Sequence, residues 1–446
     1  MIKPLTSDFF KRDKTSIITG VVIAFLISFL PLEATSPFVI ICLGLSIGMF
    51  LIFLNSDYKN FNFLLTLFIV AFLLRILVSL CLYNLVFLYK GTGGLLGDGW
   101  AYSENGYEIV KMWKAGITNV SIVTKNMLKI SNTGTLGNHD FYNARIYSFT
   151  GKSPLSLVFI NCLAGSLVAI MTYKMTEQLS NRKAAMLAAI LTSFWPSTFL
   201  WSIQNYKEPI VVFLICFLMW IALNLTRRFR FYLLFSIIGL MVVLKEFREI
   251  ALFAILVSLL FSILFSLSIR KEMYFLIIFI GLIVAFFYLQ KFKSSLPKIF
   301  EYESLLEWMQ RMRSYRSYGN LAFLADWDIT SIPIFIIFLP IALIAAWLAP
   351  FPWQLGSFSQ IIAMPEMIIF YCCIPSMIYG IRFILKNRFK QGAFIIIYIS
   401  ITSAILALID SNIGTLFRHR AMILPFCFIF IAIGLDKYNF RITAHE

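Results

Sequence analysis

Residues 61–89 read FNFLLTLFIVAFLLRILVSLCLYNLVFLY, and Arg75 is the one formally charged residue in this run. A helix of about 20 apolar residues is long enough to cross the hydrocarbon core of a bilayer. Similar runs recur along the 446-residue chain, which is 60% hydrophobic. A water-soluble core cannot absorb this much apolar surface, so we predict an all-α polytopic integral membrane protein. We expect a single membrane domain over residues 1–446.

The basic segments of the chain predict its topology. The N-terminal residues 3–14 and two later groups at residues 386–390 and 437–441 all favour the cytoplasm. All three groups can lie in the cytoplasm only if one of the runs 273–290 and 331–349 does not cross the membrane. We therefore predict about twelve spans, within a range of about eleven to thirteen, and cytoplasmic termini. The apolar runs lie at residues 15–32, 36–54, 61–89, 155–176, 184–200, 209–226, 231–244, 250–268, 273–290, 331–349, 367–385, 392–410 and 421–436.

The formal net charge of +16 does not indicate a nucleic-acid partner. Much of the Lys and Arg lies in short loops between apolar runs, where the positive-inside rule expects it. The remaining basic residues lie in loops on the opposite face, where they are available to an anionic substrate. The composition therefore favours membrane lipids and a negatively charged ligand as partners.

Two polar segments interrupt the apolar pattern. Residues 90–154 form the first large outer loop, directly after the third run, and residues 291–330 form a second polar loop. The stretch YSENGYEIVKMW in the first loop has the spacing of an amphipathic helix. Its side chains Tyr102, Ile109 and Trp113 are expected to lie on the membrane surface.

The first loop contains a candidate catalytic acid in the motif GDGW (residues 97–100). The glycines on either side of Asp98 permit close approach of the backbone to a ligand. A carboxylate at the membrane surface can act as general base toward a sugar hydroxyl. The neighbouring Trp100 and Tyr102 are candidate substrate-binding residues. The alternative is a surface turn, since Gly-Asp-Gly is favourable turn chemistry.

Two later polar clusters are expected on the same outer face. In the first, Lys207 is a candidate phosphate ligand, whereas Glu208 directly precedes Pro209 and also suits a helix N-terminus. In the second, KEFRE, Lys245 and Arg248 are candidate ligands, and an ion-paired helical turn is an equally good interpretation.

Basic residues near the end of the chain complete the candidate set. The motif FRHR contains Arg418, His419 and Arg420, and guanidinium groups so near an apolar boundary favour a phosphate or a buried acid as partner. Arg313 and Arg316 in the second polar loop are further candidates. We expect Arg418 to bind substrate and Arg420 to serve as an anchor. The cysteines and histidines show no metal-ligand spacing, so no metal site is predicted.

The stretches GDGWAYSENGYEIVKMW (97–113) and FYNARIYSFTGKSPLSLVFINCLAGSLVAIMTYKMTEQLSNRKAAMLAAILTSFWPSTFLWSIQNYKEP (141–209) resemble GT-C fold membrane glycosyltransferases over roughly residues 61–250. The resemblance places Asp98 in the position of the family's catalytic acid. It implies transfer of a sugar from a polyprenyl-phosphate or pyrophosphate donor to a cell-surface glycan or lipid acceptor, at the outer face of a bacterial inner membrane. The loop departs from the family in lacking a paired Asp-Asp, so a divalent metal cofactor is not indicated.

Two other functions remain open from the sequence. O-antigen polymerases and ligases also join lipid-linked sugars and rely on late Arg and His residues, a role that fits Arg311, Arg313, Arg316, Arg418 and His419. A lipid-linked oligosaccharide flippase or other transporter is a third interpretation. It predicts charges within the helical bundle, whereas the polar clusters gather at one face.

Overall fold

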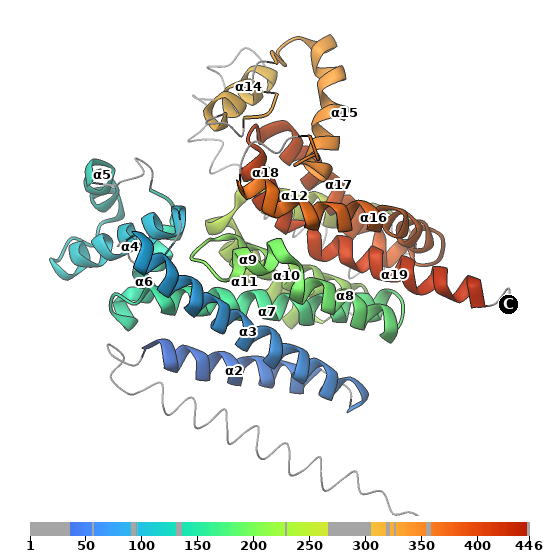
Figure 1. The fold of residues 1–446 in the computed structure, drawn as a ribbon, viewed down its shortest axis with the longest axis horizontal. Helices are drawn as coiled ribbons and strands as arrows, with labels where there is room; N and C mark the ends of the chain where they lie inside the picture. Colours follow the sequence, from blue (N-terminus) through green and yellow to red (C-terminus); the bar gives the residue numbers. More distant parts are fainter. Residues whose placement is uncertain are drawn as a thin grey trace, which may run out of the picture. The chain divides into compact units, whose positions relative to one another are not determined.

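The computed structural model is helical throughout its regular elements (Figure 1). It describes residues 36–55, 58–90, 95, 97–130, 136–227, 230–265, 305–317, 322–324, 327–353 and 358–443. In chain order the helices are α2 (Ser36–Asn55), α3 (Tyr58–Lys90), α4 (Asp98–Lys114), α5 (Val120–Ile130), α6 (Asn138–Thr150), α7 (Pro154–Leu179), α8 (Arg182–Phe194), α9 (Pro196–Ser202), α10 (Glu208–Arg227), α11 (Phe231–Phe247), α12 (Glu249–Phe265), α14 (Leu305–Arg316), α15 (Ile332–Leu348), α16 (Phe358–Asn387), α17 (Phe389–Ile409), α18 (Ile413–His419), η2 (Arg420–Met422) and α19 (Leu424–Thr443).

The helices confirm the prediction of an all-α polytopic membrane protein. Six of the described helices are long and apolar enough to cross a membrane, and eight spans result if each of two bent helix pairs counts as one. The predicted total of about twelve spans stays a prediction. The runs 15–32 and 273–290 lie outside the described residues.

One of these bends divides a run that the sequence predicted to be continuous. The run 184–200 forms α8 and α9, which meet at an angle of 54°. Pro196 is the first residue of α9 and cannot donate a hydrogen bond back into α8, so the helix breaks before it. The run 331–349 is instead a single helix, α15, despite Pro340 in its interior.

The chain divides into two compact units, which are described separately. The first contains residues 1–170 and 198–213, and the second contains residues 171–197 and 214–446. In the first unit, α3 packs against α2, and α4 packs against both α5 and α6. In the second, α16 packs along α19, and α12, α14 and α15 pack on α17.

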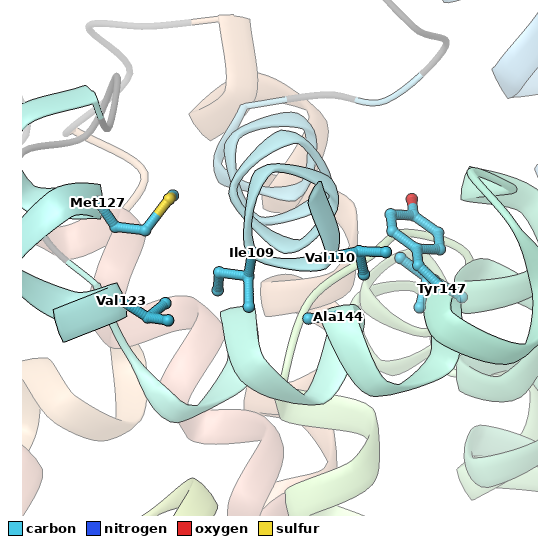
Figure 2. Close-up of a cluster of buried hydrophobic side chains, with 7 residues drawn as sticks. Ile109, Val110, Val123, Met127, Ala144 and Tyr147 are labelled. Atoms are coloured by element: carbon cyan, nitrogen blue, oxygen red, sulfur yellow. The ribbon is translucent and has the colours of Figure 1, made fainter. Parts of the chain in front are cut away.

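A small hydrophobic core joins α4, α5 and α6 in the first unit (Figure 2). Ile109 of α4 is completely buried in it, beside Val123 of α5 and Ala144 of α6. The expectation that Ile109 lies on the membrane surface is therefore wrong, because the apolar side of α4 covers protein. A Cβ added at Gly106 would lie 2.7 Å from the Cβ of Asn143, so a glycine here allows α4 and α6 to approach closely.

Small residues also allow α16 and α19 of the second unit to pack closely. A Cβ at Gly380 of α16 would collide with the carbonyl oxygen of Phe430, and one at Gly434 of α19 would collide with that of Ser376. Close approach through small residues is typical of packing between membrane helices.

Candidate functional site

Asp98 is the first residue of α4, and its side chain is exposed. The preceding Gly97 has φ +51°, a left-handed conformation that favours glycine, and its carbonyl oxygen accepts from the backbone N–H of Trp100 at 3.2 Å. The sharp entry into α4 thus explains why the motif contains glycine before the acid. A carboxylate at this position also interacts favourably with the positive end of the helix dipole.

The turn that contains residues 203–207 is fastened to the start of α4. The Asn205 side-chain amide donates to the Gly99 carbonyl oxygen at 3.1 Å. A Cβ at Gly99 would lie 3.4 Å from the Asn205 carbonyl oxygen, so the second glycine of GDGW permits a close backbone approach. The Asn161 amide donates to the carbonyl oxygens of Gln204 and Tyr206, each at 2.7 Å. This turn leads directly into Lys207 and into Glu208, the first residue of α10, so these residues are held near the helix of Asp98.

Arg75 supports the same turn from within α3. Its Nε donates to the Ser202 hydroxyl at 2.9 Å, and its Nη1 donates to the Ala71 carbonyl oxygen at 3.1 Å. The guanidinium lies over the Phe199 ring, 4.9 Å from its centroid. A buried intramembrane charge is costly unless it has such partners, and these bind it to the segment that precedes Asn205.

His139 of α6 contributes a buried imidazole to this region. It packs edge-on against Tyr102, with ring centroids 5.0 Å apart, and stacks with Tyr142. Burial lowers the pKa of His139 to about 4, although the nearby carboxylate of Glu208 opposes that change. His139 is therefore neutral near pH 7, and it places an uncharged polar side chain near Lys207 and Glu208.

Asp140, the next residue, is a second carboxylate with a different environment. Its Oδ1 accepts from the Asn105 amide at 3.2 Å, and its Oδ2 accepts from the Gly137 backbone N–H at 2.7 Å. Burial raises its pKa to about 6, against the effect of these hydrogen bonds. Both oxygens are occupied, so Asp140 holds α6 against α4 and is poorly placed to take a proton from a substrate.

The sequence analysis did not identify His139, Asp140 or Asn205. The motif GNHD offered one indication of a structural role, because an acid three residues after a glycine suits the start of a helix. The contacts of these residues with α4 and the 203–207 turn join positions far apart in the chain, and the local pattern does not reveal them.

In the second unit, Asp410 follows the last residue of α17 and its side chain is completely buried. Its Oδ1 lies 2.6 Å from Nη1 of Arg316, and its Oδ2 lies 2.6 Å from Nδ1 of His419. Burial favours the neutral acid, but His419, Arg316 and the more distant Arg248 hold the pKa of Asp410 down at about 2. The carboxylate is therefore ionised and organises the basic groups around it.

Two of the predicted arginines use their N–H groups in hydrogen bonds to the protein backbone. Arg313 donates to the carbonyl oxygens of Ala407, Phe323 and Leu324 and lies over the Phe338 ring. Arg420 donates to the carbonyl oxygens of Ala346 and Ala349, and its Nη1 lies 3.0 Å from the sulfur of Met367. These bonds give both side chains a structural role. Arg418, in the last turn of α18, stays partly exposed.

The predicted site residues thus fall into two groups, one in each unit. Asp98, Trp100, Tyr102, Lys207 and Glu208 belong to the first. Lys245, Arg248, Arg313, Arg316, Arg418, His419 and Arg420 belong to the second. The convergence of the two groups around one substrate stays a prediction. Among the described residues, His, Cys, Asp and Glu form no group of three or more placed to hold a metal ion.

These features define a polytopic helical membrane protein with carboxylates and basic residues gathered at the ends of its helices. Residues 140–289 match the family described as dolichyl-phosphate-mannose-protein mannosyltransferase, whose members have the GT-C fold. The match confirms the resemblance to GT-C glycosyltransferases and supports a membrane glycosyltransferase of that type. It includes Asp140, Lys207 and Arg248 but begins after Asp98. The comparison with curated proteins gave no match.

Proposed function

We propose that the protein transfers a sugar from a polyprenyl-phosphate or pyrophosphate donor to a glycan or lipid acceptor. The reaction takes place at the outer face of a bacterial inner membrane, with both termini in the cytoplasm. The observation that supports this proposal best is the position of Asp98. It is an exposed carboxylate at the start of a helix, and the Asn205–Gly99 hydrogen bond joins that start to the segment bearing Lys207 and Glu208.

Asp98 acts as the general base in this mechanism. It takes the proton of the acceptor hydroxyl as the new bond forms between the acceptor oxygen and the anomeric carbon. The bond between that carbon and the phosphate oxygen breaks, and its electron pair leaves with the phosphate. Asp98 is better suited to this role than Asp140, whose oxygens both accept protein hydrogen bonds within the buried α4–α6 interface.

Lys207 and the aromatic residues bind the donor. The Lys207 ammonium is partly exposed and offers charge to the phosphate, whose negative charge increases as the sugar departs. Trp100 and Tyr102 lie in the first turns of α4, within the same segment as Asp98, and supply ring surfaces for the sugar. Glu208 is almost fully buried at the N-terminus of α10, where a carboxylate complements the helix dipole.

The test is Asp98→Asn in the purified full chain, assayed with a panel of polyprenyl-phosphate-linked sugars. The change keeps the size of the side chain and removes the base, so turnover is expected to fall about 10²–10⁴-fold. Glu108→Gln is the matched control, because Glu108 lies on the same helix and pairs with Lys111 at the surface. It is expected to retain activity. Near-normal turnover by Asp98→Asn would refute the assignment of the base.

A polymerase or ligase is the second candidate, favoured by the His419–Asp410 contact in the second unit. An aspartate that orients an imidazole is an arrangement used for proton transfer. If Asp98→Asn stays active while His419→Gln is inactive and the wild-type product is a polymer of repeat units, the second candidate replaces the first.

A further inference from the structure

The turn between α16 and α17 displays basic side chains that the proposed mechanism does not use. Four of them lie within nine residues of the chain, and all four are exposed: Arg382, Lys386, Arg388 and Lys390. The stretch between Glu366 and Asp410 contains no acidic residue. No ion pair with another described residue neutralises any of the four cations. Their positive charge is therefore not balanced within the described part of the chain.

Hydrogen bonds and close packing hold this turn in one shape. The backbone N–H of Arg388 donates to the Ile384 carbonyl oxygen at 2.8 Å, and the Arg388 carbonyl oxygen accepts from the Gly392 N–H at 3.0 Å. Ile384 is completely buried, and a Cβ added at Gly392 would collide with its side chain. The backbone that bears the cations is thus ordered before any ligand arrives, which lowers the entropic cost of binding.

The end of α19 extends the basic surface. The ammonium of Lys437 lies over the ring of Phe383, 5.4 Å from its centroid, so it is beside the last turns of α16. The one acid at this position, Asp436, lies 3.1 Å from the Lys437 ammonium and accepts from the Asn181 amide at 2.7 Å. That amide precedes the exposed Arg182–Lys183 pair of α8, which packs along α19 (Figure 1). Asp436 is engaged by these contacts and leaves the cations of the turn unbalanced.

Two apolar side chains lie between the basic residues of the turn. Leu385 is 41% exposed and Phe389 is 39% exposed. Cations interleaved with exposed apolar groups are suited to the boundary between headgroups and acyl chains, where each kind of side chain finds a favourable partner. The positive-inside rule predicts on which side of the membrane the turn lies, but it requires neither the rigid display nor the interleaved apolar residues.

We propose that the α16–α17 turn, together with Lys437 and the start of α8, is a binding surface for anionic phospholipid headgroups. The Lys and Arg side chains contact the headgroup phosphates, and Leu385 and Phe389 contact the uppermost acyl segments. In the proposed topology this is the cytoplasmic leaflet, whose negative surface potential attracts juxtamembrane basic clusters. The surface is separate from the residues assigned to sugar transfer.

The experiment follows the thermal unfolding midpoint of the full chain in phosphatidylcholine nanodiscs that contain increasing fractions of phosphatidylglycerol. We expect the midpoint to rise with the fraction of the anionic lipid. Raising the ionic strength to about 1 M shortens the Debye length to about 3 Å and should remove most of this response. No sugar transfer is measured, so the outcome is independent of the Asp98 test.

The double variant Lys386→Gln with Lys390→Gln removes two cations from the turn. We expect the fraction of phosphatidylglycerol that gives half of the maximal shift to increase at least about fivefold, the order of one lost surface cation. Lys386→Arg with Lys390→Arg retains the charge and should retain the response. Each variant is compared with itself in pure phosphatidylcholine, so a change in its basal stability does not enter the comparison.

Lys114→Gln with Lys125→Gln is the matched control, because it removes the same charge from two exposed side chains of α4 and α5. It is expected to respond like the wild type. The proposal is overturned if phosphatidylglycerol has no effect beyond phosphatidylcholine, or if the two Gln variants weaken the response alike. It is also overturned if a soluble polyglutamate peptide stabilises the chain in phosphatidylcholine as strongly as the anionic lipid does, because the surface would then fit an acidic protein segment.

Discussion

The two polar regions of the molecule are held together by different kinds of side chain. Around the start of α4, neutral amides such as Asn161 and Asn205 hold the backbone, and the carboxylate of Asp98 stays exposed. Around Asp410, the carboxylate is buried and charged groups surround it. An amide network can position a reactive group without changing its charge, whereas an ion cluster sets the local potential. The first arrangement leaves a carboxylate available to act as a base, whereas the second surrounds its carboxylate with basic side chains.

The largest expected effect in this comparison belongs to Asn205, the amide that joins the 203–207 turn to the helix of Asp98. Asn205→Ala removes the bond to the Gly99 carbonyl oxygen. We expect kcat to fall about 10²-fold with little change in KM, because small displacements of a catalytic group have effects of that order. Steady-state kinetics with the purified variant measure kcat and KM separately.

Asn143→Ala is the control for that prediction. The Asn143 amide donates to the Tyr102 carbonyl oxygen at 3.1 Å and ties α6 to α4 farther along the helix. It is expected to lower the thermal unfolding midpoint while leaving kcat near the wild-type value. If Asn205→Ala lowers stability without lowering kcat, the amide network is merely structural and the contrast between the regions disappears.

The sequence predicted the membrane helices well and the polar contacts poorly, for a physical reason. The run 36–54 corresponds to α2 and the run 61–89 to α3, because bilayer thickness imposes a length on any apolar helix. The contacts that define the two polar regions depend on tertiary structure. Arg420, for example, donates to a carbonyl oxygen 74 residues away, whereas the sequence suggested an anchoring role and gave no sign of that partner.

The next effect, of moderate size, separates the two arginines of the FRHR motif. Arg418→Lys is expected to lower turnover about tenfold, because an ammonium cannot reproduce a bidentate guanidinium contact with phosphate. Arg420→Lys is expected to spare turnover and reduce stability, because Arg420 is buried and bonded to the carbonyl oxygens of Ala346 and Ala349. Donor turnover and thermal unfolding are measured for both variants. If Arg420→Lys is inactive and Arg418→Lys is active, Arg420 binds the substrate and Arg418 does not.

The smallest expected effect concerns the neighbours His139 and Asp140, whose ionisation makes opposite contributions to stability. The pKa of His139 falls from 6.5 to about 4 on folding, so its contribution is lost as the pH decreases through that window. The pKa of Asp140 rises from 3.8 to about 6, so its contribution is lost as the pH increases through that window. Between about pH 6.5 and about pH 5 each amounts to about 1 kcal/mol, and the two nearly cancel in the wild type.

Substitutions at the pair should reveal the two contributions separately. Asp140→Asn leaves only the contribution of His139, so the free energy of unfolding is expected to decrease on acidification. His139→Gln leaves only the contribution of Asp140, so the free energy of unfolding is expected to increase as the pH falls over the same range. Denaturant unfolding at several pH values measures both slopes against the wild type. Parallel profiles for all three proteins would mean that His139 and Asp140 do not titrate in this window.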